Sequence, residues 1–256
     1  MHAPEAEFPA VAADILVRLR RQQPRIHCIT NAVAQTFTAN ILLAVGAVPS
    51  MTIAPEEVAD FVVGADALLV NLGTLDRGRR DATGIAIDRA SELGVRWLLD
   101  PVFIERSPTR AVFAQALVRM HPSAVHVNRS EFAAMAHAEA EADALSRFAM
   151  ETGAVIVVTG ETDFVADGAR LARIANGHPW MALVTGMGCA ASALVVACLA
   201  VEPDPWRAAT AGLLAFGIAG EMAAEAARGP GSLAVGIIDA VHRLDPSELV
   251  ARARVT

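Results

Sequence analysis

The sequence predicts an α/β protein with three layers, in which a mostly parallel central sheet carries helices on both faces. Two observations predict this class. Segments of strand and helix composition alternate along the chain with short connections between them. The strand segments are mostly apolar throughout rather than alternating, as in parallel strands that are buried on both faces. The sequence contains no linker, low-complexity tract or repeat, so we expect a single domain over residues 1–256.

The elements of the first part of the chain follow from apolar runs and from helix start and stop signals. Pro24 ends the first helix after a basic last turn, and Pro55 fits the first turn of a later helix. The expected strands are residues 25–30, 47–53, 66–72 and 95–99. The expected helices are residues 16–22, 33–45, 56–63, 79–93 and 110–120.

The second part of the chain continues the alternation and then becomes helical. The pair Asp167-Gly168 predicts a hairpin over residues 164–174, because both residues suit a turn with positive φ. Gly229-Pro230-Gly231 breaks a long Ala-rich helix, and two short helices follow it. The other expected strands are residues 123–127, 154–158 and 180–184. The other expected helices are one that starts near Glu131 and residues 143–152, 189–199 and 205–228.

Composition and charge exclude several classes of partner. Hydrophobic residues make up 54% of the chain, the net charge is −7 and no basic cluster occurs, so we expect no nucleic-acid partner. The apolar runs are too short and too rich in Gly and Ala for a membrane span of about 20 residues. Three cysteines without a CxxC pair indicate a reducing, cytoplasmic setting. Residues 1–13 lack a basic flank and a long apolar segment, so we expect no signal peptide.

The segment Thr185-Gly186-Met187-Gly188-Cys189, between an apolar run and a small-residue helix, is the strongest local signal. It presents free backbone N–H groups and a helix N-terminus, which attract negative charge. Three interpretations compete: a dinucleotide fingerprint, an anion hole with Cys189 beside it, and a close-packed turn with an inert cysteine. No lysine follows the glycines, so the loop is not a Walker A motif. The helix N-terminus is expected to lower the pKa of the Cys189 thiol.

Polar side chains follow most of the expected strands, at the edge where such sheets bind ligands. Each of these residues could equally be a helix cap, so a binding site is indicated by the whole set rather than by any single residue. The residues at these strand ends are Asn31, Met51, Asn71, Asp100, Asn128, Thr159 and Gly186.

Two carboxylates near this edge are candidates for organising a magnesium ion. Asp100 leaves a buried strand, and Glu131 stands three residues after Asn128. A capping arrangement around Asn128 explains Glu131 equally well. Met51 fits either core filling or an apolar wall for a small ring.

Other residues that stand out have simpler explanations. His27 lies inside an apolar strand and is expected to be a satisfied core residue. Trp97 and Trp180 are expected to lie in strands and to pack in the core.

Taken together, the motifs of the chain resemble those of the hydroxyethylthiazole kinase family, over nearly the whole length. In the first half, the matching segments are His27-Cys28-Ile29-Thr30-Asn31, Ala39 to Ala47 with Pro49 and Met51, Asn71-Leu72-Gly73-Thr74-Leu75 and Asp100-Pro101-Val102. In the second half, they are Asn128-Arg129-Ser130-Glu131, Val158-Thr159-Gly160-Glu161, Asn176-Gly177-His178-Pro179, Thr185-Gly186-Met187-Gly188-Cys189 and Gly220-Glu221.

The resemblance implies a ribokinase-like fold and a transferase that moves the γ-phosphate of ATP to 4-methyl-5-(2-hydroxyethyl)thiazole in thiamine salvage. It implies that Cys189 is catalytic and accepts or positions the hydroxyl proton. The family is a cytoplasmic homotrimer with active sites between subunits, so residues near the N-terminal strands can serve a neighbour's site. The implied binding residues are Met51, Gly186 and Asn31 for the thiazole, His126, Thr159 and Asn128 for ATP, and Asp100 and Glu131 for Mg²⁺.

The sequence departs from the family pattern on the nucleotide side. A glycine-rich run usually follows Asp100-Pro101-Val102, but this chain has Phe103-Ile104-Glu105-Arg106. The usual Arg-Gly before Asn128 is His126-Val127 here, so an imidazole replaces a permanent guanidinium. These changes predict weaker ATP binding or a different phosphate donor.

Three alternatives to the thiazole kinase remain open at this stage. The chain could be a kinase for a related small alcohol, or a kinase-derived protein that binds a heterocycle without phosphorylating it. It could also be a thiol-dependent hydrolase, which needs an imidazole within reach of Cys189, from His27 or His178.

Overall fold

The computed structural model describes residues 8–256, and in it eight strands form one sheet with the order β2-β1-β3-β4-β5-β6-β7-β8. Neighbours from β2 to β6 pair in parallel, whereas β6–β7 and β7–β8 are antiparallel. The strands are β1 Arg25–Ile29, β2 Val48–Ser50, β3 Ala67–Asn71, β4 Arg96–Asp100, β5 Ala124–Asn128, β6 Val155–Thr159, β7 Asp163–Ala166 and β8 Leu171–Ile174. Residues 1–7, part of the segment that we expect not to be a signal peptide, lie outside the described residues.

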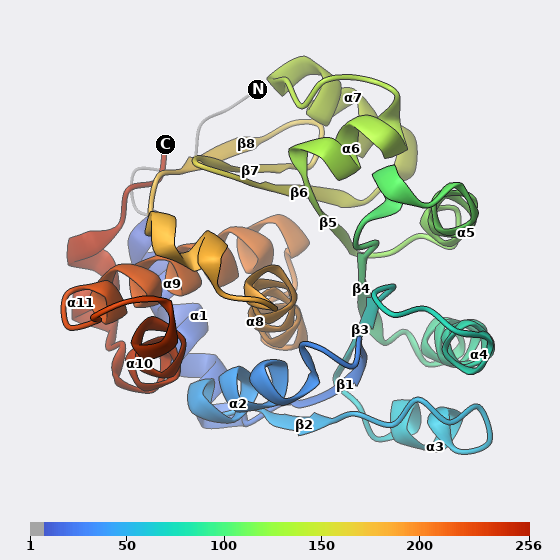
Figure 1. Cartoon of the computed structure of the whole chain (residues 1–256), viewed down its shortest axis with the longest axis horizontal. Coiled ribbons are helices and arrows are strands. Elements are labelled where there is room, and N and C mark those ends of the chain that lie inside the picture. Colours follow the sequence, from blue (N-terminus) through green and yellow to red (C-terminus); the bar gives the residue numbers. More distant parts are fainter. Residues whose placement is uncertain (1–7) are drawn as a thin grey trace.

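Helices cover both faces of this sheet, which confirms the predicted fold class. One face carries α1, α2 and α8 to α11, and the other carries α3 to α7 (Figure 1). The helices of the first face are α1 Phe8–Gln22, α2 Gln35–Val45, α8 Met187–Val201, α9 Pro205–Ala224, α10 Pro230–Arg243 and α11 Pro246–Arg252. Those of the second face are α3 Val58–Val63, α4 Arg77–Leu93, α5 Pro108–Val118, α6 Arg129–Ala136 and α7 Ala142–Thr152. Short 3₁₀ helices add η1 Ile104–Arg106 and η2 Pro179–Leu183.

The apolar character of the central strands is explained by burial on both sides. All five residues of β3 are buried, and consecutive residues contribute to opposite clusters: Leu68 packs toward α3 and α4, and Leu69 packs toward α8. Helix α8 is buried along nearly its whole length, because it lies between the sheet and α9. This explains its composition of small and aliphatic residues.

The segment 180–184, which we expected to be a strand, instead lies mostly in the 3₁₀ helix η2, with Val184 as the extended residue that follows it. Pro179 starts this helix, and the ring of His178 accepts a hydrogen bond from the N–H of Trp180 at 3.2 Å. The segment pairs with no strand, and Leu183 is 64% exposed. Trp180 is therefore half-buried beside the loop, whereas Trp97 packs in the core as expected.

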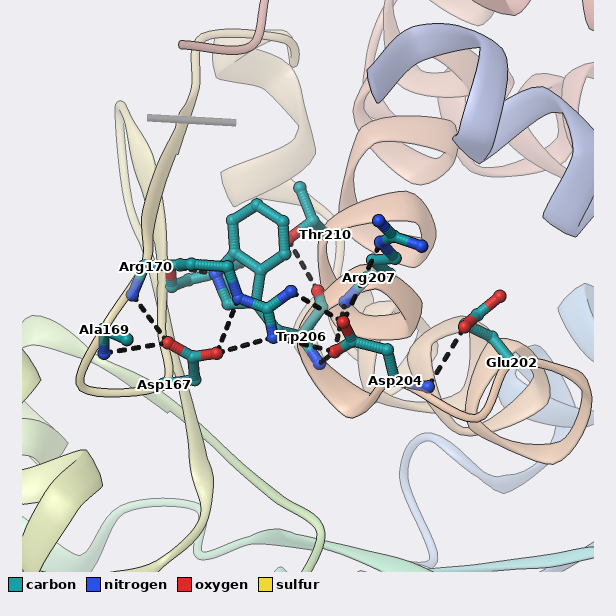
Figure 2. Close-up of polar contacts among 9 residues, drawn as sticks. Asp167, Ala169, Arg170, Glu202, Asp204, Trp206, Arg207 and Thr210 are labelled. Carbon is teal, nitrogen blue, oxygen red and sulfur yellow. Dashed lines mark hydrogen bonds and ion pairs between the residues drawn. The ribbon is translucent and has the colours of Figure 1, made fainter. Parts of the chain in front are cut away.

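The predicted hairpin is anchored to the start of α9 by a cluster of charged and aromatic side chains (Figure 2). The guanidinium of Arg170 makes two hydrogen bonds to Asp204, at 2.6 and 2.9 Å. It also lies 4.5 Å from the centre of the Trp206 ring. The indole of Trp206 donates to the carbonyl of Val165 at 3.0 Å, so the cluster fixes the antiparallel edge of the sheet to α9.

The parallel strands end at one edge of the sheet, and this is where the polar strand-end residues meet. Asn71 and Asp100 are register partners on β3 and β4, and Asn128 and Thr159 are partners on β5 and β6. Among residues 8–256, no helix is long and apolar enough to span a membrane.

Candidate functional site

A cavity of about 740 Å³ opens at the carboxyl ends of the parallel strands, as expected for this class of sheet. The loop before α8 forms one wall, and the segment after β4 forms another. Eight of the nine site residues predicted from the sequence line it. These are Asn31, Asp100, His126, Asn128, Glu131, Thr159, Gly186 and Cys189. Met51 lies outside this cavity, where its carbonyl accepts a hydrogen bond from Gln35.

The loop residue Gly186 adopts a left-handed conformation, with φ of 82° and ψ of 3°. A Cβ atom at this position would lie 3.2 Å from the Cβ of Ala34, so both the backbone and the space favour glycine. Gly186 is the N-cap of α8, and no side chain caps the first amides of this helix. These amides and the helix dipole therefore remain available for an anion in the cavity.

The sulfur of Cys189, in the first turn of α8, lies between two asparagine amides. The Nδ2 atoms of Asn31 and Asn71 each donate to Sγ at 3.2 Å. Asn31 also donates to Oδ1 of Asn71 at 3.0 Å, which fixes the orientation of both amides. The thiol is thus held at one defined position at the end of the sheet.

The expected lowering of the thiol pKa at Cys189 is wrong. Burial, together with the nearby negative charge of Asp100, raises the pKa to about 12, although the two asparagine amides act in the opposite direction. Burial outweighs the helix N-terminus because the thiol is only 8% exposed. Cys189 is therefore a neutral thiol at pH 7.

Asp100, at the end of β4, is buried and held by two side chains. Its Oδ2 accepts hydrogen bonds from Asn71 Nδ2 at 2.6 Å and from Ser192 Oγ at 2.8 Å. Burial, and then repulsion from Glu131, raises the pKa of Asp100 to about 7. A carboxylate in such a position is stabilised by a bound cation.

Glu131 forms the capping box that was one of its two predicted interpretations. Its Oε2 accepts from the backbone N–H of Asn128 at 2.8 Å, while the Asn128 side chain accepts from the N–H of Glu131 at 2.9 Å. Its Oε1 accepts from the N–H of Phe103 at 2.8 Å, and burial raises its pKa. Glu131 therefore joins the loop after β4 to the start of α6, and its negative charge faces Asp100.

Asp100 and Glu131 are the carboxylates that could organise a magnesium ion at this edge, and both oxygens of Glu131 already accept backbone hydrogen bonds. No group of three or more His, Cys, Asp or Glu side chains that could hold a metal occurs within residues 8–256. The two side chains that donate to Asp100 both bind Oδ2, and a backbone hydrogen bond from Val102 also acts on this carboxylate. Magnesium commonly takes one or two protein carboxylates and otherwise binds phosphates and water.

His126, on β5, is buried and its ring is hydrogen-bonded on both sides. Nδ1 lies 2.5 Å from Ser192 Oγ, and Nε2 lies 3.2 Å from Thr159 Oγ1. Burial lowers the pKa of His126 to about 4, so the ring is neutral at pH 7. The residue that stands where the resemblance predicts an arginine thus carries no charge into the cavity.

The segment Phe103 to Arg106, which stands where the resemblance predicts a glycine-rich run, lies after β4 on the same side of the cavity as His126. Phe103 adopts a left-handed φ of 57° and is 54% exposed at the cavity wall. This is a strained conformation for a bulky residue, of the kind that often occurs at functional sites. Arg110, held by the carbonyl of Val102 at 2.5 Å, is the only cavity-lining residue among residues 8–256 with a permanent positive charge.

Sequence reasoning missed the site roles of Arg110 and Ser192 and did not connect Asn71 with Cys189. Ser192 stands three residues after Cys189, so both lie on one face of α8, and this spacing was the available signal. Asn71 was identified as a strand end, but its contact with Cys189 depends on how α8 sits against β3. For Arg110, the only sequence signal of a place in the cavity was its position shortly after the segment Phe103 to Arg106.

The structure removes two of the alternative interpretations. The 3₁₀ helix η2, not a strand, leads into Gly186, and α8 is followed by α9, so the loop is not a dinucleotide fingerprint. Neither His27 nor His178 lines the cavity, and Cys189 is bonded to asparagines rather than to an imidazole. His27 is a core residue, as expected, and its Nδ1 lies 2.8 Å from Ser50 Oγ, but its buried Nε2 has no hydrogen-bond partner among the described residues, so the ring is only half satisfied. A thiol–imidazole hydrolase is therefore not supported.

Comparison with known sequences finds one family over almost the whole chain. The model of the hydroxyethylthiazole kinase family matches residues 16–247. A hydroxyethylthiazole kinase from Clavibacter sepedonicus is 43% identical over 255 residues, covering 94% of this chain and 92% of that protein. One from Granulibacter bethesdensis is 45% identical over 253 residues, covering 94% and 92%.

Comparison with solved structures agrees with the fold. A hydroxyethylthiazole kinase protein from Pyrococcus horikoshii OT3 superposes with a TM-score of 0.92 at 36% identity, covering 96% of this chain and 98% of that one. An ADP complex of Bacillus subtilis pyridoxal kinase gives a TM-score of 0.61 at 15% identity, covering 78% and 92%, and this likeness concerns the fold alone.

Proposed function

The chain belongs to the hydroxyethylthiazole kinase family, and on this premise we propose that it phosphorylates the primary alcohol of 4-methyl-5-(2-hydroxyethyl)thiazole with ATP, in thiamine salvage. The observation that carries the proposal is the cavity itself. The uncapped amides after Gly186, the thiol of Cys189 and the carboxylate of Asp100 line one space. Phosphoryl transfer requires mainly positioning and neutralisation of charge, which these groups supply.

Cys189 acts at the acceptor hydroxyl in this proposal. Its thiol is neutral at pH 7, so it positions the alcohol by a hydrogen bond rather than removing a proton beforehand. Asn31 and Asn71 hold the sulfur in place. The amides at Gly186 bind the phosphoryl group or the polar end of the thiazole at low reorganisation cost.

On the nucleotide side, Asp100 would hold Mg²⁺, and the nearby Glu131 would add negative charge. When bound, Mg²⁺ neutralises the charge of the phosphates. Arg110 adds the one permanent positive charge of the cavity wall. Thr159 and Asn128 contact ATP at the ends of β6 and β5, and His126 shapes the wall beneath them.

The proposed assembly is a homotrimer with active sites between subunits. Met51 supports this, because the backbone near it, with the edge strand β2, lies outside the cavity of its own chain. Val48 on that edge is 51% exposed, as is typical of a strand that can be covered by a partner. Light scattering of the purified protein tests this, and a monomeric mass contradicts it.

Two broader assignments complete the proposal. We expect residues 1–256 to act as one kinase domain, because one sheet carries every strand of the described part of the chain. We expect the protein to be cytoplasmic, because its three cysteines are free and buried.

The test is a coupled assay of ADP formation with the thiazole alcohol, alongside a panel of other small alcohols. We expect turnover to depend on the thiazole and on Mg²⁺. ADP formation that is faster with another alcohol would reassign the substrate.

One observation favours a second function, a heterocycle-binding protein with an impaired nucleotide site. His126 and Thr159 are bonded to each other rather than free to face ATP. Calorimetry separates the two functions, since thiazole binding without measurable ATP binding or ADP formation selects the binding protein.

A further inference from the structure

Ser192 is a fully buried polar residue that contacts two cavity-lining residues, Asp100 and His126, and the proposed function gives it no role. It is 0% exposed and lies on α8, where it contacts Asp100 at the end of β4 and His126 on β5. Its Oγ lies 2.8 Å from Asp100 Oδ2, 2.5 Å from His126 Nδ1 and 3.1 Å from the carbonyl of Gly188. The contact with Gly188, four residues earlier, is a common one for a serine inside a helix. Alanine would suffice for packing in this Ala-rich helix, so the contacts with Asp100 and His126 are the ones that point to a role in the site.

The hydrogen-bonding capacities of the groups give this chain of contacts a direction. When Asp100 is ionised it only accepts, so Ser192 donates its single proton to Oδ2. Ser192 Oγ then accepts from Nδ1 of His126, which makes Nδ1 the protonated nitrogen of the neutral ring. Nε2 is left as an acceptor for the hydroxyl of Thr159. The order of donation is therefore Thr159 to His126 to Ser192 to Asp100.

The two ends of this chain lie on different parts of the site. Thr159 ends β6 and is half-buried at the cavity wall on the proposed nucleotide side. Asp100 ends β4 on the proposed metal side, and the strand between them, β5, carries His126. Because Ser192 and Asn71 both donate to Oδ2, they fix the orientation of the carboxylate, on which a backbone hydrogen bond from Val102 also acts.

We propose that Ser192 and His126 are positioning residues, which fix the Asp100 carboxylate for a divalent cation and connect it to the Thr159 hydroxyl. This inference rests on the proposed function and deepens it. Loss of the Ser192 hydroxyl lowers the affinity for the cation, whereas loss of the contact between His126 Nε2 and Thr159 lowers the affinity for the nucleotide. Neither residue touches the reacting atoms.

Histidine allows the two contacts to be tested one at a time. His126→Asn retains an N–H donor close to the position of Nδ1, and His126→Gln retains a polar group close to the position of Nε2. We expect His126→Asn to keep Mn²⁺ affinity within about threefold but to raise the dissociation constant for ADP. We expect His126→Gln and Ser192→Ala to weaken Mn²⁺ binding about tenfold, as for the loss of one hydrogen bond to a charged group.

The experiment is a calorimetric titration of Mn²⁺ into each full-length variant saturated with ADP, with ADP titrated separately. Thr210→Val is the matched control, because it removes another fully buried helical hydroxyl, which donates to the carbonyl of Trp206 away from the cavity. Its Mn²⁺ affinity is expected to be unchanged. Thermal unfolding of each variant shows whether the fold is kept.

The opposite behaviour of the two His126 variants distinguishes positioning from a general structural role. The inference is overturned if His126→Asn and His126→Gln lose Mn²⁺ affinity to the same extent, or if Ser192→Ala keeps the Mn²⁺ affinity of the wild type. Failure of the proposed function has a different signature, since wild-type protein would then bind Mn²⁺ and ADP without phosphorylating the thiazole.

Discussion

Replacing Asp100 by asparagine is expected to stabilise the free protein and to abolish most of its activity. Burial and the charge of Glu131 raise the pKa of the Asp100 carboxyl to about 7, whereas an aspartate in an unfolded chain titrates near about 3.9. The folded state therefore binds the proton more tightly. Stability from this group is fully present below about pH 4 and is lost as the pH rises through about 7.

The size of this effect follows from the difference between the two pKa values. One pKa unit corresponds to about 1.36 kcal/mol, so the ionised carboxylate costs the folded protein up to about 4 kcal/mol at pH 8. Asparagine keeps the shape and an acceptor for Ser192 without the charge. We expect Asp100→Asn to raise the free energy of unfolding by about 2 to 4 kcal/mol at pH 8 in EDTA. Near pH 4 the two proteins should converge.

The assay is urea unfolding at a series of pH values between 4 and 8, together with the rate of ADP formation in Mg²⁺. Turnover of Asp100→Asn should fall about 100-fold or more, because the carboxylate proposed to hold the cation is lost. Asp88→Asn, on the exposed face of α4, is the control and should change stability by less than about 0.5 kcal/mol. A variant that is less stable than wild type at pH 8, or that keeps the wild-type pH dependence, refutes the reasoning.

Three further predictions follow from the same contacts. Cys189→Ala should keep the fold and thiazole affinity but lose most turnover, and unchanged turnover in the ADP assay would exclude Cys189 as an important group. Gly186→Ala should raise the KM for the thiazole and lower the free energy of unfolding by about 1 to 2 kcal/mol. The reason is that φ is 82° at this position and the new Cβ would lie 3.2 Å from Ala34. Gly84→Ala, with no atom within 4 Å of its Cβ position, is the control, and an equal rise in KM there contradicts the argument. Arg170→Met should lower the free energy of unfolding by about 1 to 2 kcal/mol and leave the KM for the thiazole unchanged, since the contacts of Arg170 lie at the start of α9. If urea unfolding shows no loss of stability, the cluster in Figure 2 does not stabilise the fold.

The fold, and the meeting of most candidate site residues in one cavity, were predictable from the sequence because they depend on local pattern and on one topological rule. Buried parallel strands are apolar throughout, and their carboxyl ends share an edge. Asn31, Asp100, Asn128 and Thr159 could therefore be brought together without knowing the strand order. The resemblance to the kinase family then attached roles to them, which the sequence alone could not do.

The errors arose where tertiary surroundings outweigh local pattern. The apolar run 180–184 has strand composition, but Pro179 starts a 3₁₀ helix and the run pairs with no strand. The helix N-terminus does favour a thiolate at Cys189, but burial beside Asp100 has the larger effect. Ser192 was overlooked although its spacing from Cys189 placed both on one face of α8, because its partners Asp100 and His126 come from two strands far away in the sequence.

The central claim is that the cavity formed by the Gly186 loop, Cys189 and Asp100 transfers phosphate to an alcohol. It is tested most directly by ³¹P NMR of the protein incubated with ATP, Mg²⁺ and 4-methyl-5-(2-hydroxyethyl)thiazole. A phosphate monoester of the hydroxyethyl group should form in step with ADP, and its rate should fall sharply in Cys189→Ala. ADP that accumulates with free phosphate and no ester, or an ester that forms equally fast in the variant, would contradict the account.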